Sequence, residues 1–363
     1  MESISKDKQI PPYLVFFVIH AMQIGVNILG VQRIIAKSAG YDSWLSVILA
    51  TLFSYIILFF IFQILKKGNG DLTDINQFVF GKWLGKLISI SFATYFTATV
   101  ISILRTYIEV LQIWLFPNIS VFIFSFIFLV LALYIIYGGF RTIVGVAYFS
   151  VVLPFFMYLI FLYVIPYSDY TDLLPILNHS IIDILKGTTH LAMAFSGYEM
   201  ILLFYPFLQD PKKSQKWAYF GLTYTGIIYL FIVIISFGYY SEEQLQHLIW
   251  PILSIWKIVR VSFLWRFEYY GIAMWSLVIL PNICLLIWCS GRILKKTIHI
   301  PQRSAVVWVA LVALACTSLF QTRVQITKYL EILNNAGLLF RWIFIPLLLV
   351  LLLIAKKVKK NAK

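Results

Sequence analysis

The sequence predicts an all-α integral membrane protein with about ten transmembrane helices. Of its 363 residues 61% are hydrophobic and only 12% are charged, and the mean hydropathy of +0.89 lies far outside the soluble range. Apolar stretches close to the roughly 20 residues that cross a bilayer recur along the whole chain. We therefore expect a single polytopic membrane domain over residues 1–363.

The apolar stretches define ten predicted spans. The third is longer than a bilayer requires, so we expect it to tilt or to protrude. No small-residue cleavage site precedes the first, so we expect no removable signal peptide. In chain order the spans cover residues 11–32, 44–65, 84–115, 120–137, 142–165, 184–208, 217–238, 262–290, 304–320 and 337–355.

The net charge of +14 is distributed unevenly between the two sides of this predicted bundle. Of the 29 Lys and Arg residues, 18 fall in the termini and the even-numbered connections. This positive-inside pattern predicts that both termini are cytoplasmic, and it accounts for the basic charge without a nucleic-acid partner. The opposite connections receive only seven: Arg33, Lys37, Lys257, Arg260, Arg323, Lys328 and Arg341.

Two predicted spans contain residues that weaken a helix near mid-span. Gly25, Asn27 and Gly30 lie in the first span, and Gly197 lies in the sixth. Backbone freed from a helix inside hydrocarbon survives only beside protein or a wet cavity. Paired interruptions in the two halves of a membrane protein indicate a ligand site near the bilayer midplane.

The number of spans also predicts an inverted repeat. Because five is odd, a second group of five spans must start on the opposite membrane face from the first. We expect residues 1–165 and 184–355 to form two five-helix repeats, an architecture that brings two broken helices together at a shared site.

The sixth span contains Phe195-Ser196-Gly197-Tyr198-Glu199, which resembles the FxGxE pattern of the amino acid–polyamine–organocation (APC) transporter superfamily. The first span resembles the GxGxxxxP segment of that superfamily, with Gly25 at the first glycine. It departs from the pattern at Asn27 and Gln32. The resemblance implies a LeuT-like fold with broken first and sixth spans, and the departures weaken the case for ion-coupled transport.

A narrower resemblance covers the length of the chain. The segments QIGVNILGVQR (residues 23–33), FSGYE (195–199) and RFE (266–268) are similar to those of the B subunits of bacterial spore germinant receptors. This resemblance implies a spore inner-membrane protein of the spore germination permease family that recognises a nutrient germinant, often an amino acid. It also implies two partners, an A-type membrane subunit and a C-type lipoprotein subunit.

Broken helices suggest how a small zwitterion could be bound. Half-helix N-termini favour a carboxylate, whereas freed carbonyls favour an ammonium group. The alternative is that the glycines merely allow close helix packing. We assign the carboxylate side to Gly25, Val26, Asn27 and Ile28, with Gly30 nearby. The ammonium side is assigned to Phe195, Ser196 and Gly197, with the Phe195 ring as a lid, and Tyr198 is a further ligand-binding candidate. The ligand side chain is expected to meet Tyr95, Thr97 and Val100.

Glu199 is the most distinctive ionisable residue within a predicted span. Such groups are costly in a membrane and are functional candidates by default. Glu199 follows Gly197 by two residues, so it could gate the site or carry a proton. The alternative is a structural carboxylate that accepts hydrogen bonds from unwound backbone.

Four further charges lie in the outer halves of predicted spans. Arg105 and Glu109 are four residues apart on the third span, so they share a helix face and could pair. Arg266 and Glu268 open the eighth span. We expect the four to form an outer polar cluster that anchors helices or closes an entrance.

The sequence contains no pattern for catalysis, and we expect no metal or cofactor. Two functional hypotheses remain. In the first, the chain is a sensor subunit that converts amino-acid binding into a signal to its partners. In the second, it is a proton- or sodium-coupled amino-acid transporter. The fold cannot separate them, because function lies in the site and in the assembly.

Overall fold

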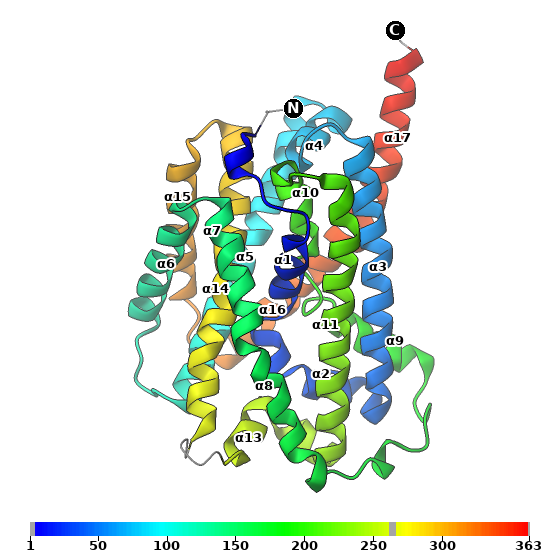
Figure 1. Ribbon diagram of the computed structural model, residues 1–363, viewed down its shortest axis with the longest axis vertical. Helices are drawn as coiled ribbons and strands as arrows, with labels where there is room; N and C mark the ends of the chain where they lie inside the picture. The colour runs from blue at the N-terminus through cyan, green and yellow to red at the C-terminus, as the bar shows by residue number, and fades with distance from the viewer. Residues whose placement is uncertain (1–3, 261–265, 362–363) are drawn as a thin grey trace.

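The computed structural model describes residues 4–260 and 266–361, and every named element in these ranges is a helix. The helices form an upright bundle whose two termini lie at the same end, here called the terminal end (Figure 1). The predicted start of the eighth span at residue 262 lies outside the described residues.

The first half of the chain contains five helical spans. Span 1 is interrupted, and span 5 changes to shorter helices after Val152. The five spans are α1 (Leu14–Gln23) with η2 (Val26–Leu29) and α2 (Val31–Ala39); α3 (Trp44–Lys67); α5 (Lys82–Trp114); α6 (Val121–Tyr137); and α7 (Phe140–Val152) with η4 (Leu153–Phe155), α8 (Phe156–Leu159) and η5 (Ile160–Tyr167).

The second half also contains five spans, and span 6 is interrupted. Shorter helices in the connections are η1 (Lys6–Lys8), η3 (Gly40–Ser43), α4 (Leu72–Phe80), η6 (Thr171–Leu173), α12 (Glu242–His247) and α13 (Pro251–Ile258). The five spans are α9 (Ile181–Leu191) with η7 (Tyr198–Met200), α10 (Ile201–Phe204) and η8 (Tyr205–Phe207); α11 (Pro211–Tyr239); α14 (Phe267–Ile298); α15 (Gln302–Thr317); and α16 (Arg323–Leu338) with the π-helical turn η9 (Leu339–Phe344) and α17 (Ile345–Asn361).

Each predicted apolar stretch coincides with one of these spans, although several boundaries need correction. Span 1 continues to Ala39 after its interruption, span 7 begins at Pro211 rather than at residue 217, span 8 ends at Ile298 rather than at residue 290, and span 10 begins at Arg323 rather than at residue 337. By length and composition, six helical stretches of the described chain could cross a membrane, and three shorter helices are also apolar. The six are Val31–Lys67, Lys82–Trp114, Phe140–Tyr167, Pro211–Tyr239, Phe267–Ile298 and Arg323–Lys359.

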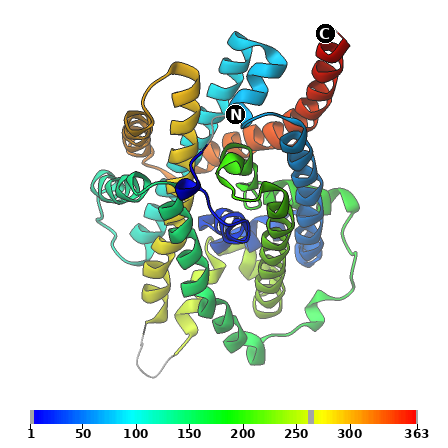
Figure 2. The ribbon, with the colours of Figure 1, turned by 45° about the horizontal axis from the view of Figure 1, so that its top comes forward.

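The spans differ in how deeply they are buried. In its most hydrophobic 18-residue window α14 is 78% buried, whereas the corresponding window of Arg323–Lys359 is only 22% buried. Helix α14 therefore forms the centre of the bundle, and span 10 lies at its edge. Figure 2 shows α17 standing apart from the other helices at the terminal end.

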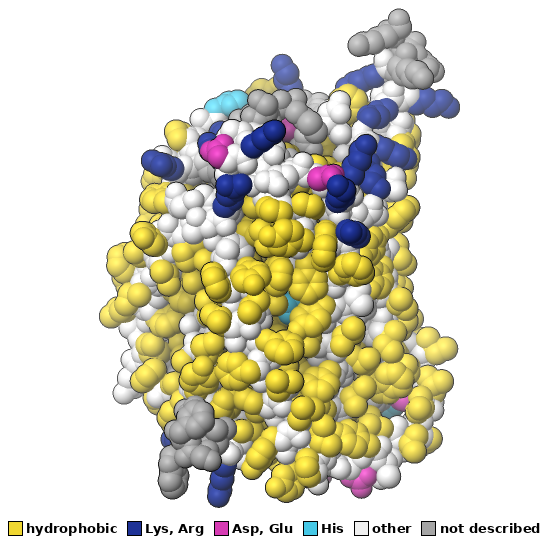
Figure 3. Space-filling model, viewed as in Figure 1, with side chains coloured by type: hydrophobic (Ala, Val, Ile, Leu, Met, Phe, Trp, Pro, Cys, Tyr) yellow, Lys and Arg dark blue, Asp and Glu magenta, His cyan; other side chains and the backbone are white. Residues whose placement is uncertain are grey.

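The half-helices α1 and α10 lie inside the bundle, whereas α9 lies at its side with Ile181 and Ile182 exposed. Figure 1 shows α1 and α10 towards the terminal end, with α2 and α9 towards the other end. Charged side chains collect at the bundle ends. Figure 3 shows Lys and Arg gathered at the terminal end above a belt of hydrophobic side chains, as expected for a protein surrounded by lipid.

At the opposite end of the bundle, a polar contact attaches the connection between spans 5 and 6 to η3. The Asp42 carboxylate accepts hydrogen bonds from the amides of Leu177 (2.8 Å) and His179 (2.9 Å) and contacts the His179 ring (3.2 Å). Burial acts to raise the pKa of Asp42, but the bonds from His179 and Leu177 outweigh it and hold this pKa below its ordinary value.

A buried ion network joins α4 to α14 near the terminal end. The Asp71 carboxylate caps α4 by accepting from the amides of Thr73 (3.1 Å) and Asp74 (3.4 Å). It also pairs with Arg292 at 2.9 Å and Lys296 at 2.8 Å. Asp71 is fully buried and Arg292 is 3% exposed, so these charges depend on one another.

Asp71→Asn should sharply reduce the stability of the purified protein. The amide carries no charge to offset those of Arg292 and Lys296, and breaking a buried ion pair by removing one member costs about 3–5 kcal/mol. The exposed pair of Asp210 and Lys213 supplies a control, because Asp210→Asn removes a solvent-screened charge and should change the melting temperature far less. Equal melting temperatures for the two variants would contradict this account.

Candidate functional site

Span 1 loses its helical backbone at Ile24. The last α-helical bond of α1 runs from the Ile24 amide to the His20 carbonyl (3.0 Å), and Ile24 and Gly25 are extended. Helix resumes as η2 and then, after Gly30, as α2. Residues 24–30 are called the span-1 break, and they coincide with the interruption expected from the glycines.

The carbonyls freed at the start of this break are bound by side chains of other spans. The Tyr229 hydroxyl on α11 donates to the carbonyl of Gln23 (3.0 Å). On α14, Asn282 Nδ2 donates to the carbonyl of Ile24 (3.3 Å). Trp275 Nε1, also on α14, donates to the carbonyl of Gly25 (3.1 Å). The unwound backbone is therefore satisfied by protein groups, as a lipid environment requires.

Span 6 is interrupted between Leu191 and Tyr198. Gly197 has a φ of +108°, in the left-handed region that favours glycine, and it directly precedes η7. Residues 192–197 are called the span-6 break. The end of α1 contacts this break, since Gln23 Nε2 donates to the carbonyl of Phe195 at 3.1 Å. A Cβ at Gly197 would lie 2.7 Å from Cβ of Met22.

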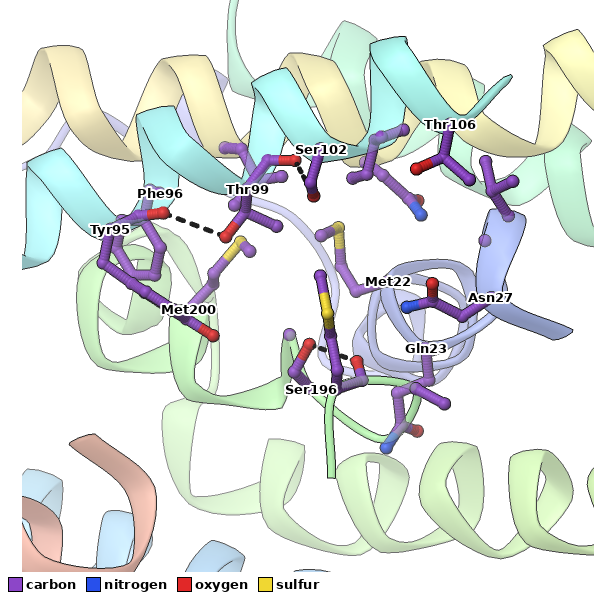
Figure 4. Close-up of a pocket in the computed structure, with 18 of the residues that line it drawn as sticks. Met22, Gln23, Asn27, Tyr95, Phe96, Thr99, Ser102, Thr106, Ser196 and Met200 are labelled. Atoms are coloured by element: carbon purple, nitrogen blue, oxygen red, sulfur yellow. Dashed lines mark hydrogen bonds between the residues drawn. The ribbon is translucent and has the colours of Figure 1, made fainter. Parts of the chain in front are cut away.

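A cavity lies where the two breaks meet helices α5 and α14. Figure 4 shows Thr106 and Asn27 at one end and Tyr95 at the other, with Met22 and Met200 pointing into the middle. This break cavity is lined by Met22, Gln23, Gly25, Val26, Asn27, Tyr95, Phe96, Thr99, Ser102, Ile103, Thr106, Met193, Ala194, Ser196, Gly197, Glu199, Met200, Asn282, Leu286 and Leu330.

Three buried polar atoms of the lining have no hydrogen-bond partner among the described residues: Gln23 Oε1, Thr106 Oγ1 and Asn282 Oδ1. The orientation of the Asn282 amide follows from its bond to Ile24, because only its nitrogen can donate to that carbonyl. A buried polar atom without a partner costs free energy. A ligand able to reach these atoms would recover part of that cost.

The sequence-predicted ligand residues divide into two groups. Gly25, Val26, Asn27, Tyr95, Ser196 and Gly197 line the break cavity. Of the remaining described candidates, Ile28, Gly30, Thr97 and Val100 lie outside its lining. Gly30 faces the backbone of Ile249 and the ring of Trp250, so it serves close packing, and the Thr97 hydroxyl donates to the carbonyl of Ala93.

Phe195 and Tyr198 face a second cavity on the other side of the span-6 break. The Phe195 ring packs on Tyr229 with ring centroids 5.0 Å apart, so it does not form the expected lid over the break cavity. The second cavity, here called the lateral cavity, has a volume of about 290 Å³. It is lined by Ala50, Phe53, Ser54, Leu185, Thr188, Thr189, Ala192, Phe195, Tyr198, Leu338, Arg341 and Trp342.

Glu199 has two partners within the bundle. One carboxylate oxygen accepts from the Gly197 amide (2.7 Å), and the other accepts from Arg341 Nη1 (3.3 Å). Arg341 is 2% exposed and also donates to Tyr95, so its assignment to an outer connection was wrong. The signal was in the sequence, since an arginine within the tenth apolar stretch must find a partner inside the bundle.

The four outer charges are distributed over separate contacts. Glu109 pairs with Arg323 at 2.5 Å, which corrects the expected pair of Glu109 with Arg105. Arg105 Nε instead donates to the carbonyl of Phe320 at 2.7 Å. Arg266 and Glu268 pair with each other at 2.8 Å. The first two contacts join α5 to the chain around the start of span 10, which fits an anchoring role.

Alanine at Gly197 should be far more damaging than alanine at Gly25. Gly197 combines a positive φ, which costs a non-glycine residue about 1–3 kcal/mol, with a close approach to Met22. Gly25 is extended, and its Cβ would meet only Asn282 Nδ2 at 3.1 Å. Gly145→Ala is the control, because nothing lies within 4 Å of its Cβ. Similar melting temperatures for the Gly197 and Gly25 variants would contradict this prediction.

Solved structures with the same fold are transporters. A Na⁺-coupled sialic acid symporter in a substrate-bound outward-open state matches 98% of this chain and 81% of its own, with a TM-score of 0.66 and 12% identity. Mhp1, a nucleobase-cation-symport-1 family transporter, matches 92% of this chain and 76% of its own, with a TM-score of 0.66 and 14% identity. At these identities the likeness shows the fold alone, and it agrees with the expected LeuT-like fold.

Sequence relatives are spore germination proteins rather than enzymes. Spore germination protein GerQB of Bacillus cereus is 36% identical over 348 residues, covering 96% of this chain and 97% of the relative. Spore germination protein B2 of Bacillus subtilis (strain 168) is 27% identical over 70% of each chain. The family model described as spore germination protein matches residues 9–326. This chain therefore belongs to the spore germination protein family.

Proposed function

We propose that this chain is the germinant-sensing membrane subunit of a spore germinant receptor and that it binds a small amino acid in the break cavity. The observation that carries the proposal is the meeting of two interrupted spans at a cavity with unpartnered polar atoms, in a member of the spore germination family. Broken helices at a shared cavity are the usual setting for small solutes in this kind of fold.

The chemistry of the lining supports a small ligand with hydrogen-bond donors. Asn282 Oδ1 is an acceptor, and the Thr106 hydroxyl can both accept and donate. The carbonyls of Gln23, Ile24, Gly25 and Phe195 already have donors. We therefore place the ammonium group of the ligand near Asn282 and Thr106, rather than at the backbone of span 6.

The size of the cavity limits the ligand further. The space open to the centre of a water-sized sphere is about 40 Å³. One water needs roughly 10–15 Å³ by this measure, so only a very small molecule fits without rearrangement. Met22, Met193 and Met200 line the cavity, and their flexible side chains could move aside for a somewhat larger ligand.

The site gives less support to an ion-coupled transporter, the alternative function. Sodium sites in such folds use unwound backbone carbonyls, but here Gln23, Ile24 and Gly25 already accept bonds from protein donors. Proton transfer through Glu199 would leave the buried guanidinium of Arg341 without its counter-charge. Both observations favour a subunit that binds its ligand without driving it across the membrane.

We further propose that the chain lies in the spore inner membrane with both termini cytoplasmic, and that it signals through an A-type membrane subunit and a C-type lipoprotein subunit. The Lys and Arg side chains gathered at the terminal end support this orientation (Figure 3). The division into repeats of residues 1–165 and 184–355 is also proposed, because half-helices of the two halves meet at the break cavity.

Binding and transport should separate when the purified protein is tested alone. In lipid nanodiscs, at least one of the twenty common L-amino acids should raise the melting temperature, since a ligand at 100 times its Kd adds about 2.7 kcal/mol of stability. In liposomes, that amino acid should show little accumulation under a proton or sodium gradient. Robust gradient-driven accumulation would instead establish the transporter function.

Thr106→Val tests the ammonium position. Valine removes the hydroxyl with little change of shape, so the bound amino acid should lose an interaction of about 1–3 kcal/mol, which is roughly 5–150-fold in Kd. Stability without ligand should not fall, because the removed hydroxyl has no described partner. Thr97→Val is the control on the same helix, since Thr97 lies outside the cavity lining. Equal affinities in both variants would refute the assignment.

A further inference from the structure

The side chain of Arg341 spans both sides of the span-6 break. Nη2 donates to the carbonyl of Ala192 (3.0 Å), where α9 has just ended. Nη1 lies 3.3 Å from Glu199 Oε1, two residues past Gly197. A single guanidinium therefore holds the chain before and after the interruption, while Glu199 itself binds the Gly197 amide.

The same guanidinium links the break to span 3. Nη1 donates to the hydroxyl of Tyr95 at 3.1 Å, and Tyr95 and Glu199 both line the break cavity. Arg341 lines the lateral cavity, so it forms part of the wall between the two cavities. A conformational change on either side of the span-6 break would therefore move the guanidinium of Arg341.

Helix α16 has a glycine at the position where a larger side chain would collide with this contact. A Cβ at Gly337, four residues before Arg341, would lie 2.6 Å from the Tyr95 hydroxyl and 2.8 Å from Arg341 Nη2. Any larger residue would have to displace the guanidinium or the phenol. Gly337 is therefore required by the contact, although glycine destabilises a helix relative to alanine.

Arg341 lies where span 10 departs from regular α-helix. It belongs to the π-helical turn η9, between α16 and α17. Pro346 follows in the first turn of α17 and has no amide hydrogen to donate to the carbonyl four residues earlier, which accounts for irregular backbone here. Single π-helical turns are frequent at functional sites. The residue that holds the span-6 break is thus at the irregular turn of a peripheral span.

Because both side chains are buried, the ion pair between Arg341 and Glu199 is expected to be either fully formed or fully broken. Glu199 is 3% exposed and Arg341 is 2% exposed, so both charges are almost entirely removed from solvent. Separating them would leave two uncompensated charges inside the bundle, which is far costlier than breaking a surface pair. The two groups must therefore move together or be re-paired together.

We propose that Arg341 is a positioning residue that couples the conformation of the span-6 break to the geometry of span 10. A ligand that shifts the break moves Glu199, and Arg341 passes this displacement to η9 and α17. The role of the ligand in this step rests on the proposed function, whereas the mechanical coupling does not. Span 10 is only 22% buried in its most hydrophobic window, so it is the least enclosed of the six long spans.

The test separates coupling from simple stabilisation. Arg341→Met alone should lower protein abundance severalfold, because Glu199 is left unpaired. The double variant Glu199→Gln/Arg341→Met removes both charges and keeps an acceptor for the Gly197 amide, so abundance should return to near wild type. Gly337→Ala displaces the guanidinium without changing any charge, and Gly145→Ala is its matched control.

The decisive readout needs no ligand. Spin labels at Lys186→Cys on α9 and Lys357→Cys on α17, in a background without the three native cysteines, report the distance between the two elements by pulsed electron paramagnetic resonance. In nanodiscs the double variant and Gly337→Ala should give shifted or broader distance distributions than wild type and Gly145→Ala. Unchanged distributions in both variants would overturn the proposal.

A second readout links the coupling to ligand response. With the L-amino acid that most stabilises the wild type, Gly337→Ala should still bind, because Gly337 lies outside the lining of both cavities. It should lose at least about tenfold in germination sensitivity relative to Gly145→Ala, as expected when a coupling free energy of about 1.4 kcal/mol is removed. Full germination sensitivity in Gly337→Ala would overturn the coupling. If no amino acid stabilises the wild type, the proposed function fails while the distance measurement still decides the coupling.

Discussion

Backbone that leaves the α-helix inside a lipid bilayer must find its hydrogen-bond partners within the protein, and the centre of this molecule is organised by that constraint. Helices α11 and α14 supply the donors that bind the freed carbonyls of span 1. Gln23 and Arg341 do the same for span 6. Helix α14 donates two of these hydrogen bonds to span 1, which requires a central position. It is the most buried of the six long spans.

This arrangement also explains how a transporter-like fold could serve as a sensor. The protein supplies its own donors at positions where a coupled ion could otherwise bind, and it neutralises Glu199 with Arg341. What remains for a ligand is a small cavity with a few unpartnered polar atoms. A sensor needs only different affinities in two states, because a ligand shifts an equilibrium by that difference and no more.

The sequence predicted the features that depend on local chemistry. Apolar stretches of bilayer length gave the ten spans, and Gly25 and Gly197 marked the two breaks, because glycine acts through its own backbone. The roles of Asn282, Thr106 and Arg341 could not be predicted in this way. Asn282 and Arg341 each bind a partner more than 100 residues away in the sequence. Thr106 lines a cavity that other spans help to form. No local sequence pattern predicts contacts of either kind.

The most direct test of this account is an experimental structure of the protein in lipid nanodiscs with its stabilising amino acid bound. The account predicts ligand density in the break cavity, with the ammonium group within hydrogen-bond distance of Asn282 Oδ1 and Thr106 Oγ1. It also predicts that Arg341 still contacts Glu199 across the span-6 break. Ligand density in the lateral cavity instead, or two uninterrupted helices at Gly25 and Gly197, would contradict it.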